Sequence, residues 1–154
     1  AAGAAPQDGL FRAVRGAGAD LASRLVARLG TGRWRFASAA VVGAGTGIAP
    51  VRERSGKRDR IHFRFTCSKF LRQTFHEWAA HSIGQSDWAR AYYQQQRDKG
   101  AGHHAAVRAL AFKWMRIVFR CWNDHTPYDE QNDHKALHAT GSKLAKLAGA
   151  LTTA

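Results

Sequence analysis

A serine set among basic residues is the feature of this sequence best suited to chemistry on a phosphate. Ser55 lies in the segment VRERSGKRDR, residues 51–60, and is followed by Gly56. The segment contains five basic and two acidic residues, namely Arg52, Arg54, Lys57, Arg58 and Arg60 against Glu53 and Asp59. Cationic side chains can hold a phosphodiester and stabilise the charge of its transition state, and a serine hydroxyl can attack phosphorus to form a covalent ester. Because most Ser-Gly pairs form turns, an ordinary charged loop is the alternative interpretation.

Two pairs of histidines are candidate metal ligands, but their spacing argues against a metal site. A zinc-binding helix carries its histidines at i and i+4, whereas His76 and His81 of the segment HEWAAH are at i and i+5. That spacing places them about 140° apart around a helix. His103 and His104 are adjacent and have no carboxylate or thiol at ligand spacing. The sequence therefore predicts no metal and no cofactor in this chain.

The overall charge points to a polyanionic partner. The chain has 154 residues with 24 Lys and Arg and 11 Asp and Glu, so its formal net charge is +13 at pH 7. Phosphate polyanions are the usual partners of such a positive field, and we expect nucleic-acid binding that weakens with salt. Hydrophobic residues make up 45% of the chain, which is enough to bury a core. No apolar run approaches the roughly 18 residues that a membrane span needs, and the N-terminus lacks a signal-peptide layout.

The two cysteines suggest the compartment. Cys67 and Cys121 stand far apart and form no CxxC pattern. This argues against a disulfide scaffold and fits a reducing cytosol. Both are predicted to be core residues, because free cysteine is among the most buried residue types.

Hydrophobic periodicity predicts a mainly α fold, a compact helical domain with a short β element near residues 60–66. In that element Ile61, Phe63 and Phe65 alternate with polar residues, the pattern of a strand buried on one face. Helices are expected over residues 20–30, 68–84, 86–100 and 103–122, with Asp20, Ser68 and Ser86 as N-caps. The three later helices should share one core, to which we assign Phe75, Trp78, Tyr92, Leu110, Trp114 and Ile117.

A glycine-containing turn precedes the first of these helices. The segment GAGAD, residues 16–20, could offer backbone N–H groups to a phosphate at a helix start. An ordinary helical hairpin is the alternative. The later segment GAGTG, residues 43–47, lacks the spacing and the βαβ frame of a dinucleotide-binding motif.

Several segments, in order and at matching distances, resemble transposases of the insertion-sequence-110 type, grouped with types 116 and 902. The serine block consists of GIAP at residues 47–50 followed by RSGK at residues 54–57. The resemblance continues through CSKFLRQTFHEWA (67–79), WARAYYQQQRDKG (88–100), HHAAVRALAFKWMRIVFRCW (103–122) and TPYDE (126–130). The glycine turn and RLVARLG are similar to the helix-hairpin segment that precedes this block, so the resemblance spans roughly residues 11–130.

The resemblance implies a DNA recombinase that moves an insertion sequence. Members of the family combine an N-terminal RuvC-like domain, which carries acidic metal ligands, with a C-terminal transposase domain that carries a nucleophilic serine. The matching serine here is Ser55. Mg²⁺ is implied for the N-terminal domain and not for this chain, and DNA, a guide-type non-coding RNA and other copies of the full-length protein are the implied partners. A bacterial, cytoplasmic, nucleoid-associated protein is expected.

The implied domain organisation places a flexible segment at residues 1–10 and the C-terminal transposase domain at residues 11–130. Within it we expect a helix-hairpin-like part (11–46), the serine loop and strand (47–66) and the helical core (68–122), followed by a weakly ordered tail (131–154). Nothing before residue 11 could encode a RuvC-like fold, so the chain by itself is expected to bind nucleic acid but not to cut it.

The predicted function is thus that of a DNA-binding transposase domain that uses Ser55 for strand cleavage and rejoining. The nucleic-acid contacts are assigned to the basic residues of the serine segment and of the segments that follow it, namely Arg52, Arg54, Lys57, Arg58, Arg60, Arg64, Lys69 and Arg72. The alternatives are a non-catalytic nucleic-acid-binding module and a truncated, inactive remnant of a transposase.

Overall fold

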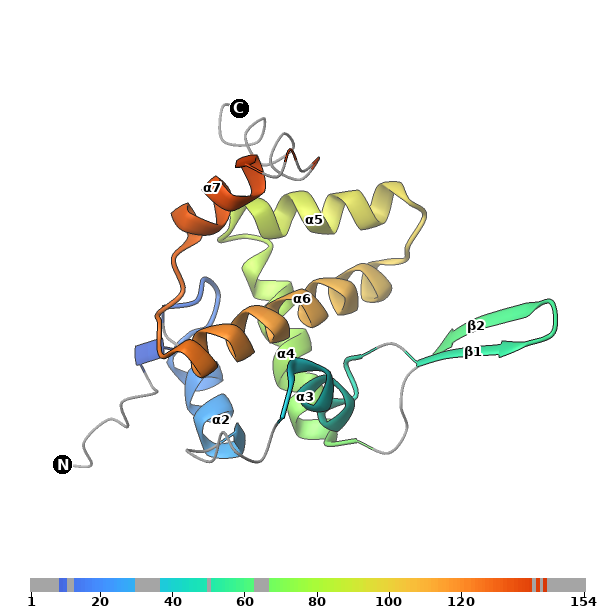
Figure 1. Ribbon diagram of the computed structural model, residues 1–154, viewed down its shortest axis with the longest axis horizontal. Helices are drawn as coiled ribbons and strands as arrows, with labels where there is room; N and C mark the ends of the chain where they lie inside the picture. The colour runs from blue at the N-terminus through green and yellow to red at the C-terminus, as the bar shows by residue number, and fades with distance from the viewer. Residues whose placement is uncertain are drawn as a thin grey trace.

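The chain is organised around one long helix. The computed structural model describes residues 9–10, 13–29, 37–49, 51–62, 67–139, 141 and 143. The helices of these ranges are α2 (Ala19–Leu29), α3 (Ala39–Thr46), α4 (Lys69–Ser82), α5 (Asp87–Asp98), α6 (His103–Asp124) and α7 (Glu130–Ala139). The central helix, α6, contacts α3, α4 and α5, and α2 packs on α4. Strands β1 (Val51–Ser55) and β2 (Arg58–His62) project from the side of this helical body (Figure 1). The predicted mainly α fold is therefore confirmed.

Serine side chains start three of the helices. The Oγ atoms of Ser38, Ser68 and Ser86 accept backbone N–H groups three residues on, at 3.3, 3.4 and 3.5 Å. Each bond satisfies an N–H group that has no partner within its own helix. The predicted caps at Ser68 and Ser86 are confirmed. The predicted cap at Asp20 is wrong, because α2 begins at Ala19 and Asp20 lies in its first turn, where its negative charge still favours the helix dipole.

Aromatic rings fill the centre of the domain. Trp78 and Trp114 are fully buried and their ring centroids lie 5.1 Å apart, while Trp88 lies 4.6 Å from Trp114. The indole N–H groups are bonded inside the fold: Trp114 donates to Ser82 Oγ at 2.7 Å, and Trp88 donates to Tyr128 Oη at 2.7 Å. Buried indoles need such partners, so these bonds fix how the rings stack.

The predicted core is largely correct. Phe75, Trp78, Leu110 and Trp114 have no exposed surface. Tyr92 and Ile117 are only half-buried and pack against the edge of the core. Tyr92 differs because Lys113 Nζ lies over its ring, 4.7 Å from the centroid, in a cation–π contact at the surface.

Helix α7 occupies part of the segment expected to be a weakly ordered tail. Asp129 Oδ1 accepts the N–H groups of Gln131 at 2.9 Å and Asn132 at 3.4 Å, which caps the start of the helix. Glu130 then accepts a hydrogen bond from Ser86 Oγ at 2.5 Å and pairs with Arg15 Nε at 3.1 Å. These long-range bonds hold α7 against the rest of the domain. The helix is polar and has no strong apolar stripe, so hydrophobic periodicity did not predict it. Residues 144–154 lie outside the described part of the chain.

Candidate nucleic-acid interface

The serine segment folds as a β-hairpin, where a charged loop was expected. β1 and β2 are antiparallel, and their register pairs Val51 with His62 and Ser55 with Arg58. Gly56 and Lys57 form the two-residue loop, with φ +59° at Gly56. A positive φ confined to the first loop position is the pattern of a type II′ turn, which matches the twist of the flanking strands.

The predicted loop over residues 51–60 was wrong because periodicity detects a strand only when one face is buried. Arg52, Arg54, Ser55, Lys57 and Arg58 are all exposed, so no apolar alternation marks β1. The signal that could have found it is a two-residue turn with glycine first, between two polar segments of equal length. The predicted β element at residues 60–66 overlaps the end of β2, while residues 63–66 lie outside the described part.

Ser55 lies at the exposed end of this hairpin and not in the helical body. Arg58 is directly opposite Ser55 across the two strands, so the two side chains share a face. Directly opposite residues have Cβ atoms about 4.5–5.5 Å apart. Lys57 is in the connecting turn, and Arg54 leaves from the other face of β1. A phosphate beside the serine hydroxyl is thus within reach of cationic side chains.

The other predicted contacts are distributed differently. Arg60 belongs to β2, but its side chain is not among those described, and Arg64 lies outside the described residues. Lys69 and Arg72 are in the first turns of α4, in the helical body. Lys69 is exposed, whereas Arg72 is half-buried and its Nη1 lies 3.8 Å from Cys67 Sγ.

The remaining reactive side chains do not form a competing site. Cys121 is buried, as predicted, and burial raises the pKa of its thiol, which makes it a poor nucleophile at neutral pH. Cys67 is half-buried, so the prediction that it is a core residue is wrong; it precedes the exposed start of α4. Among the described residues, no three His, Cys, Asp or Glu side chains come together in a way that could hold a metal ion.

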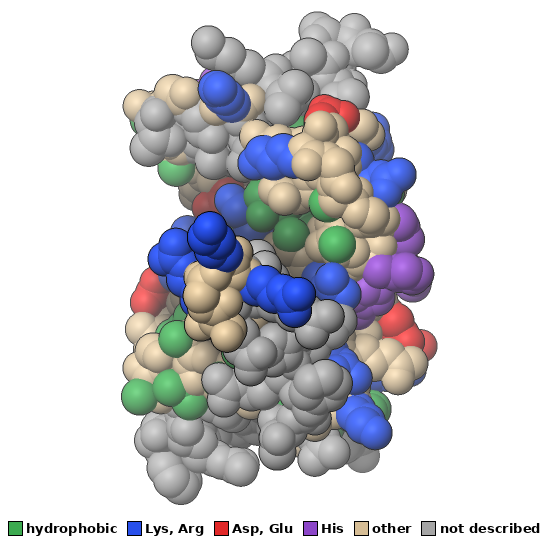
Figure 2. All heavy atoms as spheres, turned by 90° about the vertical axis from the view of Figure 1, so that its right-hand side faces the viewer, with side chains coloured by type: hydrophobic (Ala, Val, Ile, Leu, Met, Phe, Trp, Pro, Cys, Tyr) green, Lys and Arg blue, Asp and Glu red, His purple; other side chains and the backbone are tan. Residues whose placement is uncertain are grey.

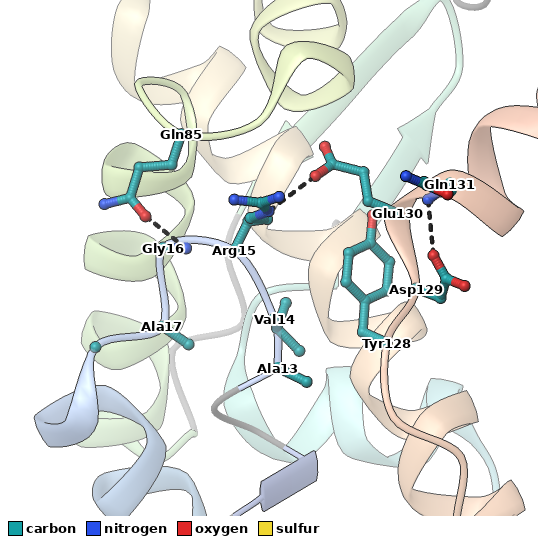
Figure 3. A pocket seen from close by; sticks show the side chains of 11 residues that line it. Ala13, Val14, Arg15, Gly16, Ala17, Gln85, Tyr128, Asp129, Glu130 and Gln131 are labelled. Atoms are coloured by element: carbon teal, nitrogen blue, oxygen red, sulfur yellow. Dashed lines mark hydrogen bonds and ion pairs between the residues drawn. The ribbon is translucent and has the colours of Figure 1, made fainter.

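The glycine turn forms hydrogen bonds to other parts of the protein. The turn contributes to a pocket of about 560 Å³ between residues 13–18 and the start of α7 (Figure 3). Gly16 N–H, which could have faced a phosphate, donates to Gln85 Oε1 at 3.1 Å. The carbonyl of Arg15 accepts the indole N–H of Trp78 at 2.9 Å. The N–H group of Gly16 is therefore not available to a phosphate.

Gly16→Ala is expected to destabilise the fold by at least about 2 kcal/mol. The left-handed conformation at φ +80° costs an alanine roughly 1–2 kcal/mol. Its Cβ would also lie 2.9 Å from the backbone of Ser82, which is too close to fit without a shift. Gly18→Ala is the matched control: it has open space around it and should change the free energy of unfolding by less than about 0.5 kcal/mol. Urea unfolding followed by circular dichroism measures both; equal stabilities would contradict the tight docking of this turn.

Comparison with known proteins assigns the chain to a family. The sequence model of the Transposase IS116/IS110/IS902 family matches residues 8–94, which is more than half of the chain. The chain therefore belongs to this family, as its serine block and helical segments indicated. The matched residues include α2, α3, the hairpin, α4 and much of α5.

Two curated relatives agree with this assignment. The chain is 30% identical over 116 residues to a mini-circle putative transposase for IS117 from Streptomyces coelicolor, with 75% of this chain and 28% of the relative covered. It is 32% identical over 119 residues to an insertion element IS900 uncharacterized 42 kDa protein from Mycobacterium paratuberculosis, with 73% and 29% covered. The chain thus spans less than a third of the length of these relatives. No helix in the described part of the chain is long and apolar enough to cross a bilayer.

Proposed function

We propose that this domain binds duplex DNA through the β1–β2 hairpin and supplies Ser55 as the nucleophile for strand cleavage and rejoining in insertion-sequence transposition. The observation that carries the proposal is the exposed Ser55 at the hairpin end, directly opposite Arg58 and next to the Gly56–Lys57 turn. Membership of the transposase family supplies the biological setting.

The shape of the hairpin favours DNA over duplex RNA. A two-stranded β-ribbon fits the major groove of B-DNA, whereas the major groove of an A-form RNA helix is too narrow to enter. The hairpin projects from the helical body, so a duplex can approach its tip (Figure 1). A guide-type RNA and association with further copies stay expectations that the resemblance implies.

The proposed reaction is a transesterification. Ser55 Oγ forms a bond to phosphorus, the bond from phosphorus to one strand oxygen breaks, and that oxygen leaves as a hydroxyl; attack by a strand hydroxyl on the serine ester reverses the step. The phosphodiester is already negative, so an approaching alkoxide is repelled unless cations neutralise the charge. The register supports this role for Arg58, directly opposite Ser55, and for Lys57 in the turn, with Arg54 on the other face of the ribbon.

The hairpin gives no general base for the serine proton among its described side chains, which are Val51, Arg52, Arg54, Ser55, Lys57 and Arg58. The proposal therefore assigns proton removal to a group other than these six side chains, either in the rest of the fold or in the metal-binding domain that the resemblance implies. Among the residues that the structure describes, no group of three His, Cys, Asp or Glu side chains is arranged to hold the Mg²⁺ that the resemblance implies for the N-terminal domain.

We expect DNA binding by this chain to weaken steeply with salt. Neutralising about five phosphates gives a slope of about −4.5 in a plot of log affinity against log salt concentration. Replacing two hairpin cations, Lys57→Gln with Arg58→Gln, should reduce the slope by about 1.8, because each phosphate contact contributes about 0.9. Fluorescence anisotropy with a labelled duplex across a salt series measures both.

The matched control removes the same charge elsewhere. Lys135→Gln with Lys143→Gln changes two exposed cations of the α7 region, which Figure 1 shows away from the hairpin. Its slope should equal that of the unmodified chain. Equal losses in the two double variants would mean that affinity follows net charge alone and that the hairpin is not the binding element.

A further inference from the structure

Three histidine rings from α4 and α6 lie against one another outside the hairpin. The ring of His104 stacks on that of His76, with centroids 5.8 Å apart, and meets the ring of His103 edge-on at 5.1 Å. Tyr93 of α5 completes the group, since its hydroxyl lies 2.8 Å from His103 Nδ1. His103 and His104 are exposed and His76 is half-buried. We refer to His76, His103 and His104 as the histidine cluster.

The histidine cluster faces the same side of the molecule as the hairpin. The start of α6 lies on the side from which β1 and β2 project (Figure 1). Figure 2 views that side directly and shows histidine side chains gathered at its right-hand edge, with Lys and Arg side chains beside and above them and acidic side chains directly below. One ligand approaching the hairpin would therefore meet this face as well.

The surroundings of the histidine cluster are mostly cationic. Burial lowers the pKa of His76, and the positive charges of His104, Arg108 and His103 lower it further. Glu77 opposes this effect, but its carboxylate is engaged by Gln73 Nε2 at 2.8 Å and Arg24 Nη1 at 2.9 Å. α6 also begins without an acidic residue in its first turn and without a side-chain cap, which leaves its positive end uncompensated. An anion bound beside His76 would favour its protonated form, against these surroundings.

We propose that the histidine cluster is a second contact for the phosphate backbone of the DNA that the hairpin binds, and that this contact strengthens as the histidines become protonated. The inference rests on the proposed DNA-binding function and adds a site and a pH dependence to it. A phosphate is the anion that fits, because it accepts hydrogen bonds from several imidazole N–H groups at once and supplies the missing negative charge. A metal ion does not fit, since no described group of three ligands is arranged to hold one.

The sign of the pH dependence follows from linkage. A bound phosphate favours imidazolium, so the pKa of a contacting histidine is higher in the complex than in the free protein. Binding then takes up protons, and affinity rises as the pH falls from the pKa of the complex towards that of the free protein, which burial lowers from its ordinary value in the case of His76. Each proton taken up adds as much as about tenfold in affinity per pH unit within that window.

The test is an anisotropy titration of a labelled DNA duplex at fixed ionic strength, from about pH 8 to about pH 5.5. We expect the unmodified chain to bind about tenfold more tightly at the lower pH. His103→Gln with His104→Gln changes only exposed side chains and should therefore fold. It should lose most of the increase in affinity that the unmodified chain shows between the higher and the lower pH. An increase in affinity at the lower pH as large as that of the unmodified chain would overturn the proposal.

The control variants separate this proposal from the proposed function. His81→Gln with His138→Gln also removes two exposed histidines, and it should keep the gain. Lys57→Gln with Arg58→Gln should weaken binding at every pH while preserving the ratio between low and high pH. Binding that depends on salt and on the hairpin but not on pH would overturn the histidine contact alone. Absence of binding at low salt and at every pH would overturn the proposed function itself.

Discussion

Ser55→Ala, introduced into a longer transposase that carries this domain, is expected to reduce the covalent protein–DNA adduct by at least about a thousandfold. The substitution removes the oxygen that we propose forms the ester, and no neighbouring described residue of the hairpin offers another nucleophile. DNA binding should stay nearly unchanged, because the substitution removes no charge and Ser55 is exposed, so no cavity forms. Denaturing electrophoresis of protein trapped on a nicked or suicide DNA substrate measures the adduct, and anisotropy measures the binding.

The matched control is a second exposed serine. Ser23→Ala removes a hydroxyl on α2 that bonds only to the carbonyl of Ala19 among the contacts described, and it should leave the adduct intact. An undiminished adduct with Ser55→Ala would exclude Ser55 as the nucleophile. The domain would then act as a non-catalytic binding module, for which the salt dependence of binding is still expected.

Trp114→Ala is expected to lower the free energy of unfolding by about 3–5 kcal/mol, the usual range for removing a buried tryptophan. Trp114 has no exposed surface and contacts the rings of Trp78, Trp88 and Tyr128, at centroid distances of 5.1, 4.6 and 5.4 Å. The substitution leaves a cavity between α4, α5 and α6 and deprives Ser82 Oγ of its indole donor. Urea unfolding monitored by far-ultraviolet circular dichroism gives the difference.

Phe70→Ala provides the comparison for this prediction. Phe70 is also aromatic but is 42% exposed, with Arg24 Cζ 5.9 Å from its ring centroid. Phe70→Ala should lower the free energy of unfolding by less than about 1 kcal/mol. A ring that stays partly in solvent contributes little burial energy, and an exposed cation–π contact is weak. Similar costs for the two substitutions would show that the aromatic core does not carry the stability of the domain.

Much of the helical body could be predicted from local sequence. The N-caps at Ser68 and Ser86 and the apolar faces of α4 and α6 appear within single segments, because helix hydrogen bonds and side-chain spacing connect residues only three or four apart. The segments that carry the family resemblance, and the position of Ser55 among its basic neighbours, can also be read from short stretches of sequence. These are properties of contiguous residues, and the sequence determined them by itself.

Only the tertiary structure decided how distant segments meet. The pairing of β1 with β2 turns an expected loop into a ribbon with Ser55 opposite Arg58, and the described side chains of β1 show no apolar alternation that would mark it as a strand. Gly16 is docked against Ser82 and Gln85, so its N–H group is occupied. The ring of His76 meets that of His104, although each histidine alone suggests an unremarkable surface position. In each case the partner lies on another strand, turn or helix, and the contact depends on chain folding that no local periodicity encodes.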